Sequence, residues 1–562
     1  MHHHLDLRTK IIIMMSVMAG LFLVALDQTI FTTSLGKIVE EFNAFSSLSW
    51  VVTAYLITST VSVPIAGKLS DMYGRRILLL IGISIFVAGS LFGGMSGSMN
   101  QLILWRAIEG IGAGIITANA FTIIGDLFAP RERARWQGVF GAVFGVATVV
   151  GPILGGYLTE THSILWMTTS WRWTLFINIP IGIIAFAVIF IFCPTLRHEK
   201  KPKIDYVGAA LLALALSVLV LAIDNTEHIF ADFMTSTGIS LLWLRIIMFT
   251  IVAITVGIFI VVENRAKEPI LPLRFFKNRN FDLIIMISLL FGAAFIGTIL
   301  YLTQFNQQVF AASPSQSGLM LLPMVGGLVL SSVIGGQLIT RTGKYKIFMQ
   351  IGTALATISI IFLTTLRPES GYFYESIIMV FLGMGLGIVM PVLNLAVQNE
   401  FEQLELGVAT SSSQLFRNLG STIGVAVFGA ILTAGIISGL GDTSQIPYIK
   451  TLAQNPAASR IGSLSDSNTL LTLNTPDIKQ KINNQADAAF TKLPVPIKTV
   501  VAQKFKAQQD NFSSIVVHAF SDGMHNIFIV AAFLMGTATI IVFGIKEKTL
   551  RTGKPQETPG EI

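Results

Sequence analysis

The sequence contains little charge and almost no cysteine. Charged residues make up 12% of its 562 residues and hydrophobic residues 52%, whereas about a quarter of the residues are charged in an ordinary soluble domain. This balance excludes a soluble globular protein and is typical of a chain that crosses a lipid bilayer many times. The single cysteine, Cys193, excludes a disulfide within the chain and a thiolate zinc site.

Common catalytic motifs are absent as well. The sequence has no G-x-x-x-x-G-K-[ST] loop, so we expect no nucleotide-hydrolysing domain. It has neither H-E-x-x-H nor G-x-S-x-G, which are the usual signs of a metalloprotease and a serine hydrolase. Clustered glycines such as Gly110, Gly112 and Gly114 lie inside apolar runs, where small residues allow close helix contact. We therefore expect no enzyme, no metal ion and no cofactor.

Long apolar runs account for about half of the chain. Each is long enough for a transmembrane helix, which needs roughly 20 residues. The even number of runs predicts that both termini lie on the same side of the membrane. Fourteen runs are predicted, at residues 11–35, 49–69, 77–96, 101–124, 136–158, 173–193, 204–223, 243–262, 281–303, 317–339, 347–366, 375–398, 409–435 and 521–545.

The net charge of +7 does not indicate a nucleic-acid partner, because most basic residues lie in short loops between the apolar runs. Loops on one side of the membrane contain Arg75, Arg133 and Lys201 among many others, whereas the opposite short loops offer only Lys37, Arg172 and Arg367. Cytoplasmic loops carry the excess of lysine and arginine. We therefore expect a multi-pass protein of the cell membrane with both termini in the cytoplasm.

The chain also contains an internal repeat. A shift of 269 residues pairs glycines of the first half with glycines of the second half, among them Gly67 with Gly336 and Gly138 with Gly407. Such repeats are typical of membrane transporters built from two related bundles. We expect an all-α membrane protein with a six-helix bundle in residues 1–193, two inserted spans in residues 194–280, and a second six-helix bundle in residues 281–562.

One external connection, at about residues 436–520, is much longer than the others. Thr475, Pro476 and Asp477 resemble the start of a helix, with an N-cap, a proline in the first turn and an acid after it. Apolar residues at helical spacing follow. We predict two external amphipathic helices packed over the mouth of a cavity, the second leading into the last span; the alternative is a disordered linker.

The second cytoplasmic loop has a distinctive pattern, Gly67-x-x-x-Asp71-x-x-Gly74-Arg75-Arg76. It resembles the signature loop of the major facilitator superfamily; the alternative is a generic charged turn. In that family the loop joins the two halves on the cytoplasmic side when the transporter is open to the outside. The resemblance therefore assigns Gly67, Asp71, Gly74 and Arg75 to a conformational latch. Thr340 occupies the position of Asp71 in the second repeat, so we expect a weaker latch there.

Four further motifs carry the same resemblance. Arg106 to Gly110 resembles the R-x-x-Q-G motif with Glu109 in place of glutamine, and Leu26 to Ile30 resembles the L-D-x-T-I motif of the fourteen-span drug:proton antiporters. Trp171, Arg172 and Trp173 match the W-R-W sequence of that family. Span five contains Gly145, Gly151, Pro152, Gly155 and Gly156. These residues resemble the antiporter motif of that family, G-P-x-x-G-G.

The resemblance implies proton-coupled export of hydrophobic or cationic small molecules by alternating access, as in multidrug efflux. We expect the chain to act as a monomer. Two alternatives remain: an exporter of an amphipathic lipid or cell-envelope precursor with the same fold, and a membrane receptor that transports nothing. The receptor alternative is disfavoured because it needs neither an antiporter motif nor buried ionisable residues.

Three ionisable residues lie at one depth in the membrane. At 1.5 Å per residue, Asp27 is roughly 12 Å from the outer end of its span, and Arg106 and Glu109 are roughly 8 and 12 Å inside theirs. Buried ionisable residues are candidates for function, although a static Arg106–Glu109 pair would explain two of them. We predict that Asp27 is the coupling acid, because Arg106 should keep the neighbouring Glu109 ionised.

Other polar residues inside the spans could line a substrate cavity or could simply join helices by hydrogen bonds. The candidates are Gln28, Thr32, Tyr55, Asn119, Asn394, Gln398, Gln414, Arg417 and Asn418.

Overall fold

The computed structural model describes residues 6–42, 48–159, 163–164, 167–193, 205–223, 226–441, 443–453, 467–474, 476–491 and 494–550. Within these ranges it has fourteen helical segments long and apolar enough to cross a membrane, as predicted. They are α1 (Leu7–Phe42), α2 (Leu48–Tyr73), α3 (Arg75–Gly94), α4 (Met99–Leu127), α5 (Pro130–Thr159), α6 with α7 (Trp173–Phe176 and Asn178–Phe192), α8 (Tyr206–Ile223), α11 (Leu241–Arg265), α12 (Arg279–Val309), α14 (Leu322–Thr342), α15 (Lys346–Leu363), α16 (Tyr372–Glu400), α17 (Leu406–Leu440) and α21 (Val495–Phe543).

Short elements connect these spans. Strands β1 (Ser163–Ile164) and β2 (Met167–Thr168) pair in an antiparallel arrangement. The remaining short elements are α9 (Thr226–Ile229), α10 (Ala231–Thr237), η2 (Leu273–Lys277), α13 (Pro314–Met320), η3 (Gln403–Glu405), η4 (Thr443–Gln445), α18 (Pro447–Ala453), α19 (Ser467–Leu473) and α20 (Pro476–Phe490).

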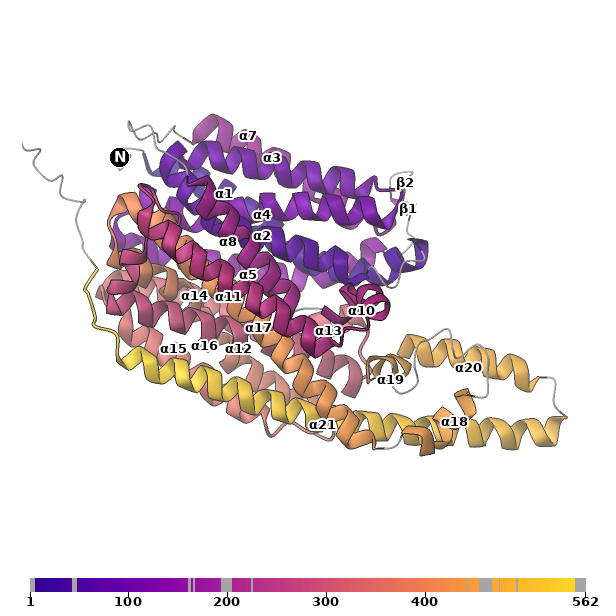
Figure 1. Cartoon of the computed structure of the whole chain (residues 1–562). Helices are drawn as coiled ribbons and strands as arrows, with labels where there is room; N and C mark the ends of the chain where they lie inside the picture. Colours follow the sequence, from indigo (N-terminus) through magenta and orange to yellow (C-terminus); the bar gives the residue numbers. More distant parts are fainter. Residues whose placement is uncertain are drawn as a thin grey trace, which may run out of the picture.

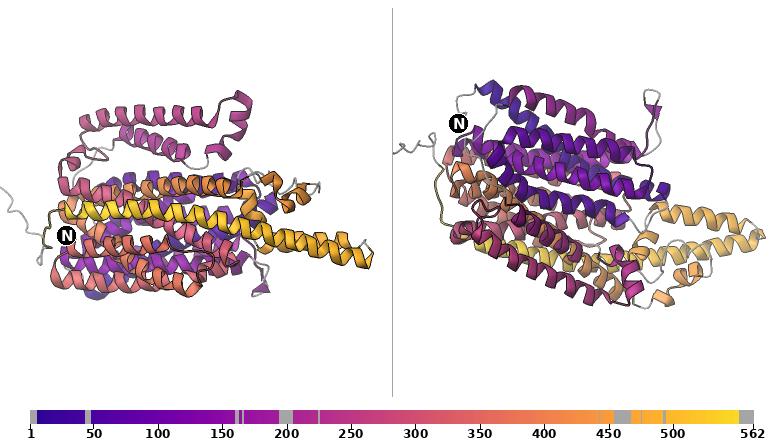
Figure 2. Two further views of the ribbon diagram at one scale, coloured as in Figure 1. Left: turned by 90° about the horizontal axis from the view of Figure 1, so that it is seen from below. Right: turned by 45° about the horizontal axis from the view of Figure 1, so that its top comes forward.

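The spans form two six-helix bundles with two additional helices beside them. Helices α1 to α7 make the N-terminal bundle, and α12, α14 to α17 and α21 make the C-terminal bundle (Figure 1). The inserted helices α8 and α11 lie against the flank of the bundles (Figure 2). Leu212 and Leu216 of α8 pack with Leu415 of α17 and Val61 of α2, so α8 covers the junction between the two bundles.

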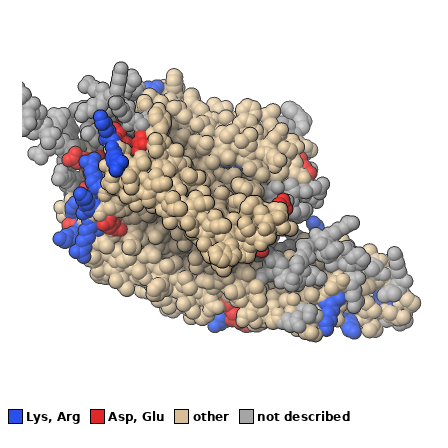
Figure 3. Space-filling view, in the orientation of Figure 1, with Lys and Arg blue, Asp and Glu red and all other residues tan. Residues whose placement is uncertain are grey.

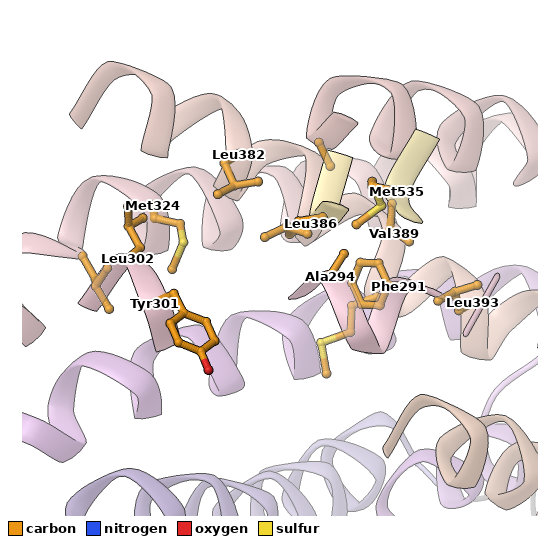
Figure 4. Packing of buried hydrophobic residues seen from close by; sticks show 14 of the residues in the cluster. Phe291, Ala294, Tyr301, Leu302, Met324, Leu382, Leu386, Val389, Leu393 and Met535 are labelled. Atoms are coloured by element: carbon orange, nitrogen blue, oxygen red, sulfur yellow. The ribbon is translucent and has the colours of Figure 1, made fainter. Parts of the chain in front are cut away.

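The C-terminal bundle has a tightly packed interior (Figure 4). Phe291 and Leu302 of α12, Val389 of α16 and Met535 of α21 are fully buried there. Lipid tails are as apolar as these side chains, so van der Waals packing rather than exclusion of water holds helices together inside a membrane. A well-packed interior of this kind allows the bundle to move as a rigid unit.

The predicted repeat appears in the contacts between the bundles. Gly67 of α2 lies against Ser411 and the Gly407 carbonyl of α17, and Gly138 of α5 lies against Ser332 and Gly336 of α14. The shift of 269 residues converts Gly67 into Gly336 and Gly138 into Gly407. One contact is therefore the symmetry mate of the other.

The described part of the long connection at about residues 436–520 contains helices, as predicted. Helix α20 begins at Pro476, and α21 runs without interruption from Val495 to Phe543, so the predicted second external helix and the last span are one helix. The predicted N-cap, Thr475, lies outside the described residues. Figures 1 and 2 show α20 and α21 projecting beyond the C-terminal bundle as a hairpin; that this hairpin packs over the mouth of a cavity stays a prediction.

Polar and aromatic contacts attach α18 to this hairpin. The ring of Tyr448 in α18 lies 5.6 Å from Phe505 and 5.2 Å from Phe512 of α21, and Gln509 donates a hydrogen bond of 3.0 Å to the Tyr448 hydroxyl. At its base, the Asn474 amide donates to Oε1 of Gln308 in α12 at 3.1 Å. The hairpin is thus attached to the C-terminal bundle.

Candidate functional site

A buried ion cluster joins α1 to α4. Nη1 of Arg106 lies 2.7 Å from Oδ2 of Asp27 and 2.8 Å from Oε2 of Glu109. Both carboxylates are completely buried, and Arg106 is 2% exposed. The three residues predicted to share one depth are therefore in direct contact.

This geometry removes the reason for preferring Asp27 as the coupling acid. The preference assumed that Arg106 belongs to Glu109 on its own helix, but the guanidinium binds both carboxylates at nearly the same distance. With both ionised, the cluster has one positive and two negative charges. An unbalanced buried charge is costly, so adding one proton to this cluster makes it electrically neutral.

Neutral side chains complete the cluster. Ser90 of α3 donates a hydrogen bond to Glu109. The amide of Asn178 in α7 donates to Asp27 at 3.1 Å, and it also lies 3.1 Å from the Ser90 hydroxyl. Four helices of the N-terminal bundle thus converge on the two carboxylates.

Aromatic rings enclose the guanidinium from two sides. Cζ of Arg106 lies 4.2 Å from the ring centroid of Phe31 in α1 and 4.2 Å from that of Tyr55 in α2. Gly110 permits this arrangement, because a Cβ there would lie 2.5 Å from the Tyr55 carbonyl. Cation–π contacts are strongest when the cation is desolvated, as it is here.

At the end of the bundles where α2 meets α3, Asp71 connects the two bundles. Its carboxylate accepts hydrogen bonds from the backbone N–H groups of Gly407, at 3.2 Å, and Val408, at 3.0 Å, and so caps the N-terminus of α17. Arg75 forms ion pairs with Asp71 and with Asp126, the latter at 2.9 Å. Asp71 and Arg75 therefore lie where a latch between the two bundles requires them.

Glycines shape the same loop. Gly74 has a φ of 97°, which a side chain would strain, and it separates α2 from α3. Gly67 has no room for a Cβ next to Ser411. The loop therefore needs glycine at both positions for a tight turn and a close approach.

The symmetry-related contact uses different chemistry. Arg131 at the start of α5 donates hydrogen bonds to the backbone carbonyls of Thr340 and Arg341 at the end of α14. An arginine at a helix C-terminus is favourable because it meets the negative end of the helix dipole. Thr340 does not reproduce the carboxylate cap of Asp71; the second contact is made by an arginine from the opposite bundle.

The antiporter motif lies where α5 packs against its neighbours. Gly145 faces Leu328 of α14, Gly151 faces Thr29 of α1, and Pro152 lies 2.8 Å from the Cβ position of Gly318 in α13. Gly155 is buried and Gly156 partly buried. The motif thus places α5 against helices of both bundles.

Several of the proposed cavity residues occur at the junction of α4, α16 and α17. Gln398 donates hydrogen bonds to the Phe121 carbonyl at 3.0 Å and to the Thr410 hydroxyl at 3.2 Å, and it accepts one from Gln137 at 2.9 Å. It therefore acts as a structural bond between the bundles. Asn119 bonds the Ile115 carbonyl of its own helix at 2.8 Å.

The other cavity candidates differ in burial. Asn394 and Gln414 are buried, and neither side chain has a hydrogen-bond partner among the described residues. Gln28 is exposed, and Arg417 and Asn418 are partly buried. The Thr32 side chain lies outside the described part of the structure.

Comparison with known proteins identifies the family. The family model described as Major Facilitator Superfamily matches residues 17–425. The chain belongs to the Major Facilitator Superfamily. Multidrug transporter protein MdtP of Bacillus subtilis is 33% identical over 98% of this chain and 95% of its own length, and Multidrug resistance protein 3 of the same organism is 34% identical over 81% and 85%.

Solved structures agree on the fold. The proton:xylose symporter XylE has a TM-score of 0.58 at 13% identity, over 96% of this chain and 97% of its own. The human organic anion transporter MFSD10 has a TM-score of 0.54 at 17% identity, and the match covers 75% of this chain and 93% of the MFSD10 chain. The protein is thus an all-α major facilitator protein with two six-helix bundles and two inserted spans, and its relatives are transporters.

The W-R-W sequence of this major facilitator protein binds the C-terminal end of α1. Arg172 pairs with Glu41 at 2.8 Å, and the Trp171 indole donates to Glu41 at 2.6 Å. The hydrogen bond from Arg172 is the main cause that lowers the pKa of Glu41. Both members of the pair are partly exposed, so the pair contributes little to stability.

Some buried polar residues of the structure were not predicted from the sequence. Ser90 gave no signal, because a lone serine in an apolar run is common. Glu375 in α16 is completely buried, and with the Asn306 amide turned toward it, the amide nitrogen lies 2.9 Å from each carboxylate oxygen. Its position in the first turn of a span made it look like a boundary residue, although a buried acid in a membrane helix is itself a signal.

Proposed function

We propose that this protein exports hydrophobic small molecules in exchange for protons, by alternating access. The observation that carries the proposal is the buried cluster in which one guanidinium binds two carboxylates. Since Asp27 and Glu109 share Arg106, the cluster gains electrical neutrality by binding one proton. A change of charge inside the N-terminal bundle alters the stability of the surrounding helix contacts, which is what coupling requires.

The cytoplasmic contacts support a conformation that is closed on that side. Asp71 caps α17, Arg131 binds the end of α14, and Gln398 bonds Gln137 and Phe121 across the junction. Opening to the cytoplasm must break these bonds together. We assign Asp71 and Arg131 to the control of that step.

The distribution of charge supports the proposed orientation. Figure 3 shows the largest group of lysine and arginine at one end of the spans, a smaller group at the opposite end where the hairpin projects, and a nearly uncharged belt between them. The positive end faces the cytoplasm by the usual rule, which puts the protein in the cell membrane with both termini inside. For the functional units we propose the bundles 1–193 and 281–562, with residues 194–280 as the insert.

Hydrophobic substrates fit this site better than the expected cations. A cation needs a carboxylate that is free to accept it, but Asp27 and Glu109 are held by Arg106, Asn178 and Ser90. Cationic substrates would therefore have to displace Arg106 from one carboxylate. Proton binding, which needs no displacement, is the simpler role for the pair.

Transport in proteoliposomes tests the proposal. The purified protein is reconstituted, an acidic lumen is imposed, and accumulation of a neutral fluorescent dye is followed in inside-out oriented vesicles. We expect the dye to accumulate in the lumen, and a protonophore to abolish this. Accumulation that persists unchanged with the protonophore would contradict proton coupling.

One groove favours the second candidate, export of an amphipathic lipid or envelope precursor. A lateral cavity of about 350 Å³ lies between α2, α4 and α8, lined by apolar residues such as Ile57, Val61 and Ile111. Ser217 of the inserted helix α8 also lines this cavity. Enrichment of one lipid class in the purified protein, and its displacement by the dye, would support this candidate.

A further inference from the structure

Arg417 is a cation inside a membrane span, and no residue in the described part of the chain provides a counter-charge for it. It is eleven residues from the start of α17 at Leu406, so its Cα lies roughly 16 Å inside that helix. No described residue forms a hydrogen bond or an ion pair with its guanidinium, and no acid acts on it electrostatically. Its one described contact there is with Phe121, whose ring centroid is 5.9 Å from Cζ.

The backbone of α17 fixes the direction of this side chain. Gly292 of α12 lies directly against the Arg417 carbonyl, so α12 occupies one side of α17 at that level. The contact with Phe121 shows that the guanidinium points the other way, toward α4 of the N-terminal bundle. Arg417 therefore lies at the junction that opens and closes during transport.

Unsatisfied polar groups lie next to it. Gln414 is three residues earlier on α17, and residues three apart share a helix face. Gln398 bonds Thr410, so one turn farther from the cytoplasm the same two helices bring Asn394 and Gln414 to a common level. The side-chain amides of both are buried with no partner in the described chain.

An unpaired arginine and two unpaired amides are expensive inside a membrane. The acids of the ion cluster do not compensate Arg417, because they are bound to Arg106. A ligand that supplies an anionic group would balance the arginine and accept hydrogen bonds from the amides. A planar guanidinium is well suited to carboxylate, sulfonate and phosphate oxygens.

We propose that Arg417 binds the anionic group of an amphiphilic substrate at the junction of α4, α16 and α17. Asn394 and Gln414 donate hydrogen bonds to this group, and Phe121 contacts the apolar part. The inference rests on the proposed export function and gives it a substrate class: organic anions with a large apolar portion. Export of an anion in exchange for a proton moves two charges in the same electrical direction, so the membrane potential drives it more strongly than export of a neutral compound.

Equilibrium binding in detergent tests the substrate class independently of transport. Three probes share a dansyl fluorophore and a hexyl linker and end in a carboxylate, an N-methylamide or a trimethylammonium group. We expect the full-length protein to bind the carboxylate about tenfold more tightly than the amide, and the trimethylammonium probe most weakly. Equal affinity for all three, or a preference for the cation, would overturn the proposal.

Variants locate the effect at Arg417. Arg417→Gln should remove the preference for the carboxylate while leaving affinity for the amide unchanged, and Arg417→Lys should keep part of it. Arg265→Gln is the matched control, since Arg265 is exposed at the end of α11, and it should bind like the parent protein. A preference that survives in Arg417→Gln would show that another group holds the anion.

Two further arms separate the possible outcomes. Displacement of the carboxylate probe by dihexanoyl phosphatidylglycerol, but not by dihexanoyl phosphatidylcholine, identifies a lipid headgroup as the source of the anion; displacement by neither leaves a free organic anion. If the binding preference is present but no gradient drives export in vesicles, the proposed function fails while the anion site stands.

Discussion

At the residue scale, Arg106 is the centre of the ion cluster because both carboxylates depend on it. Asn178 donates to both acids, to Asp27 at 3.1 Å and to Glu109 at 3.5 Å, and Ser90 donates to Glu109 as well. Neutralising either acid by an amide imitates its protonated form and leaves the guanidinium with one partner. The two acids should therefore behave alike, rather than one being essential and the other dispensable.

We predict that Asp27→Asn and Glu109→Gln each abolish accumulation driven by a pH gradient, while exchange of substrate without a gradient continues. Each variant has one acid fewer, so its cluster is neutral without a bound proton. The transport cycle then no longer requires a proton, while the remaining contacts of Arg106 persist. Dye accumulation and dye counterflow in the same proteoliposomes measure the two activities. Full gradient-driven accumulation by one variant would assign coupling to the other acid.

Sequence alone identified the members of this cluster but not their partners. Apolar spans make a buried acid or arginine conspicuous, so Asp27, Arg106 and Glu109 were predictable, and helix rise placed them at one depth. Whether Arg106 binds one acid or both depends on side-chain geometry across two helices, which no spacing rule contains. For the same reason Glu375 and its neighbour Asn306 escaped notice.

At the element scale, Asp71 joins the two bundles by capping α17, and we assign it to closing the side that we propose to be cytoplasmic. We predict that Asp71→Asn lowers turnover and leaves substrate affinity nearly unchanged, because the residue biases the conformations without touching substrate. Loss of hydrogen bonds to a charged group costs about 1.5 kcal/mol, which is roughly a tenfold shift toward the inward-open form.

Cysteine accessibility measures that shift. A cysteine at Ser412, which is 1% exposed, should react with a maleimide faster in Asp71→Asn than with Asp71 present, both in a Cys193→Ser background. Affinity that falls as far as turnover would instead place Asp71 in the substrate site.

The close approach of α5 and α14 gives a sharper prediction. Gly138→Ala should greatly reduce transport, because a Cβ at this position has no room beside the Ser332 carbonyl and keeps the bundles apart. Gly326→Ala on α14 is the control, since no heavy atom lies within 4 Å of its Cβ position. Transport rates normalised to protein in the membrane measure both; equal rates would show that the contact does not form during the cycle.

At the scale of the whole molecule, the positions of the spans were predictable, since apolar length alone marks them. The course of the external segment was less so. Its helices were correctly predicted, but the sequence contains no signal for where the hairpin points, because Asn474 and Gln308 meet across distant parts of the chain. The sequence repeat identified equivalent glycines in the two bundles. It did not show which of these glycines contact each other.

The orientation of the molecule provides the last prediction. Exposed Lys504 lies on the extended part of α21 and exposed Arg265 lies at the opposite end of the spans. With Cys193 replaced by serine, a cysteine at Lys504 should react with an impermeant maleimide in sealed cells, and a cysteine at Arg265 only after the membrane is permeabilised. The charge bias requires this result, because turning the protein over would put the lysine- and arginine-rich loops outside. Labelling of both positions in sealed cells would mean mixed insertion, and the reverse pattern would place the hairpin in the cytoplasm and contradict the proposed orientation.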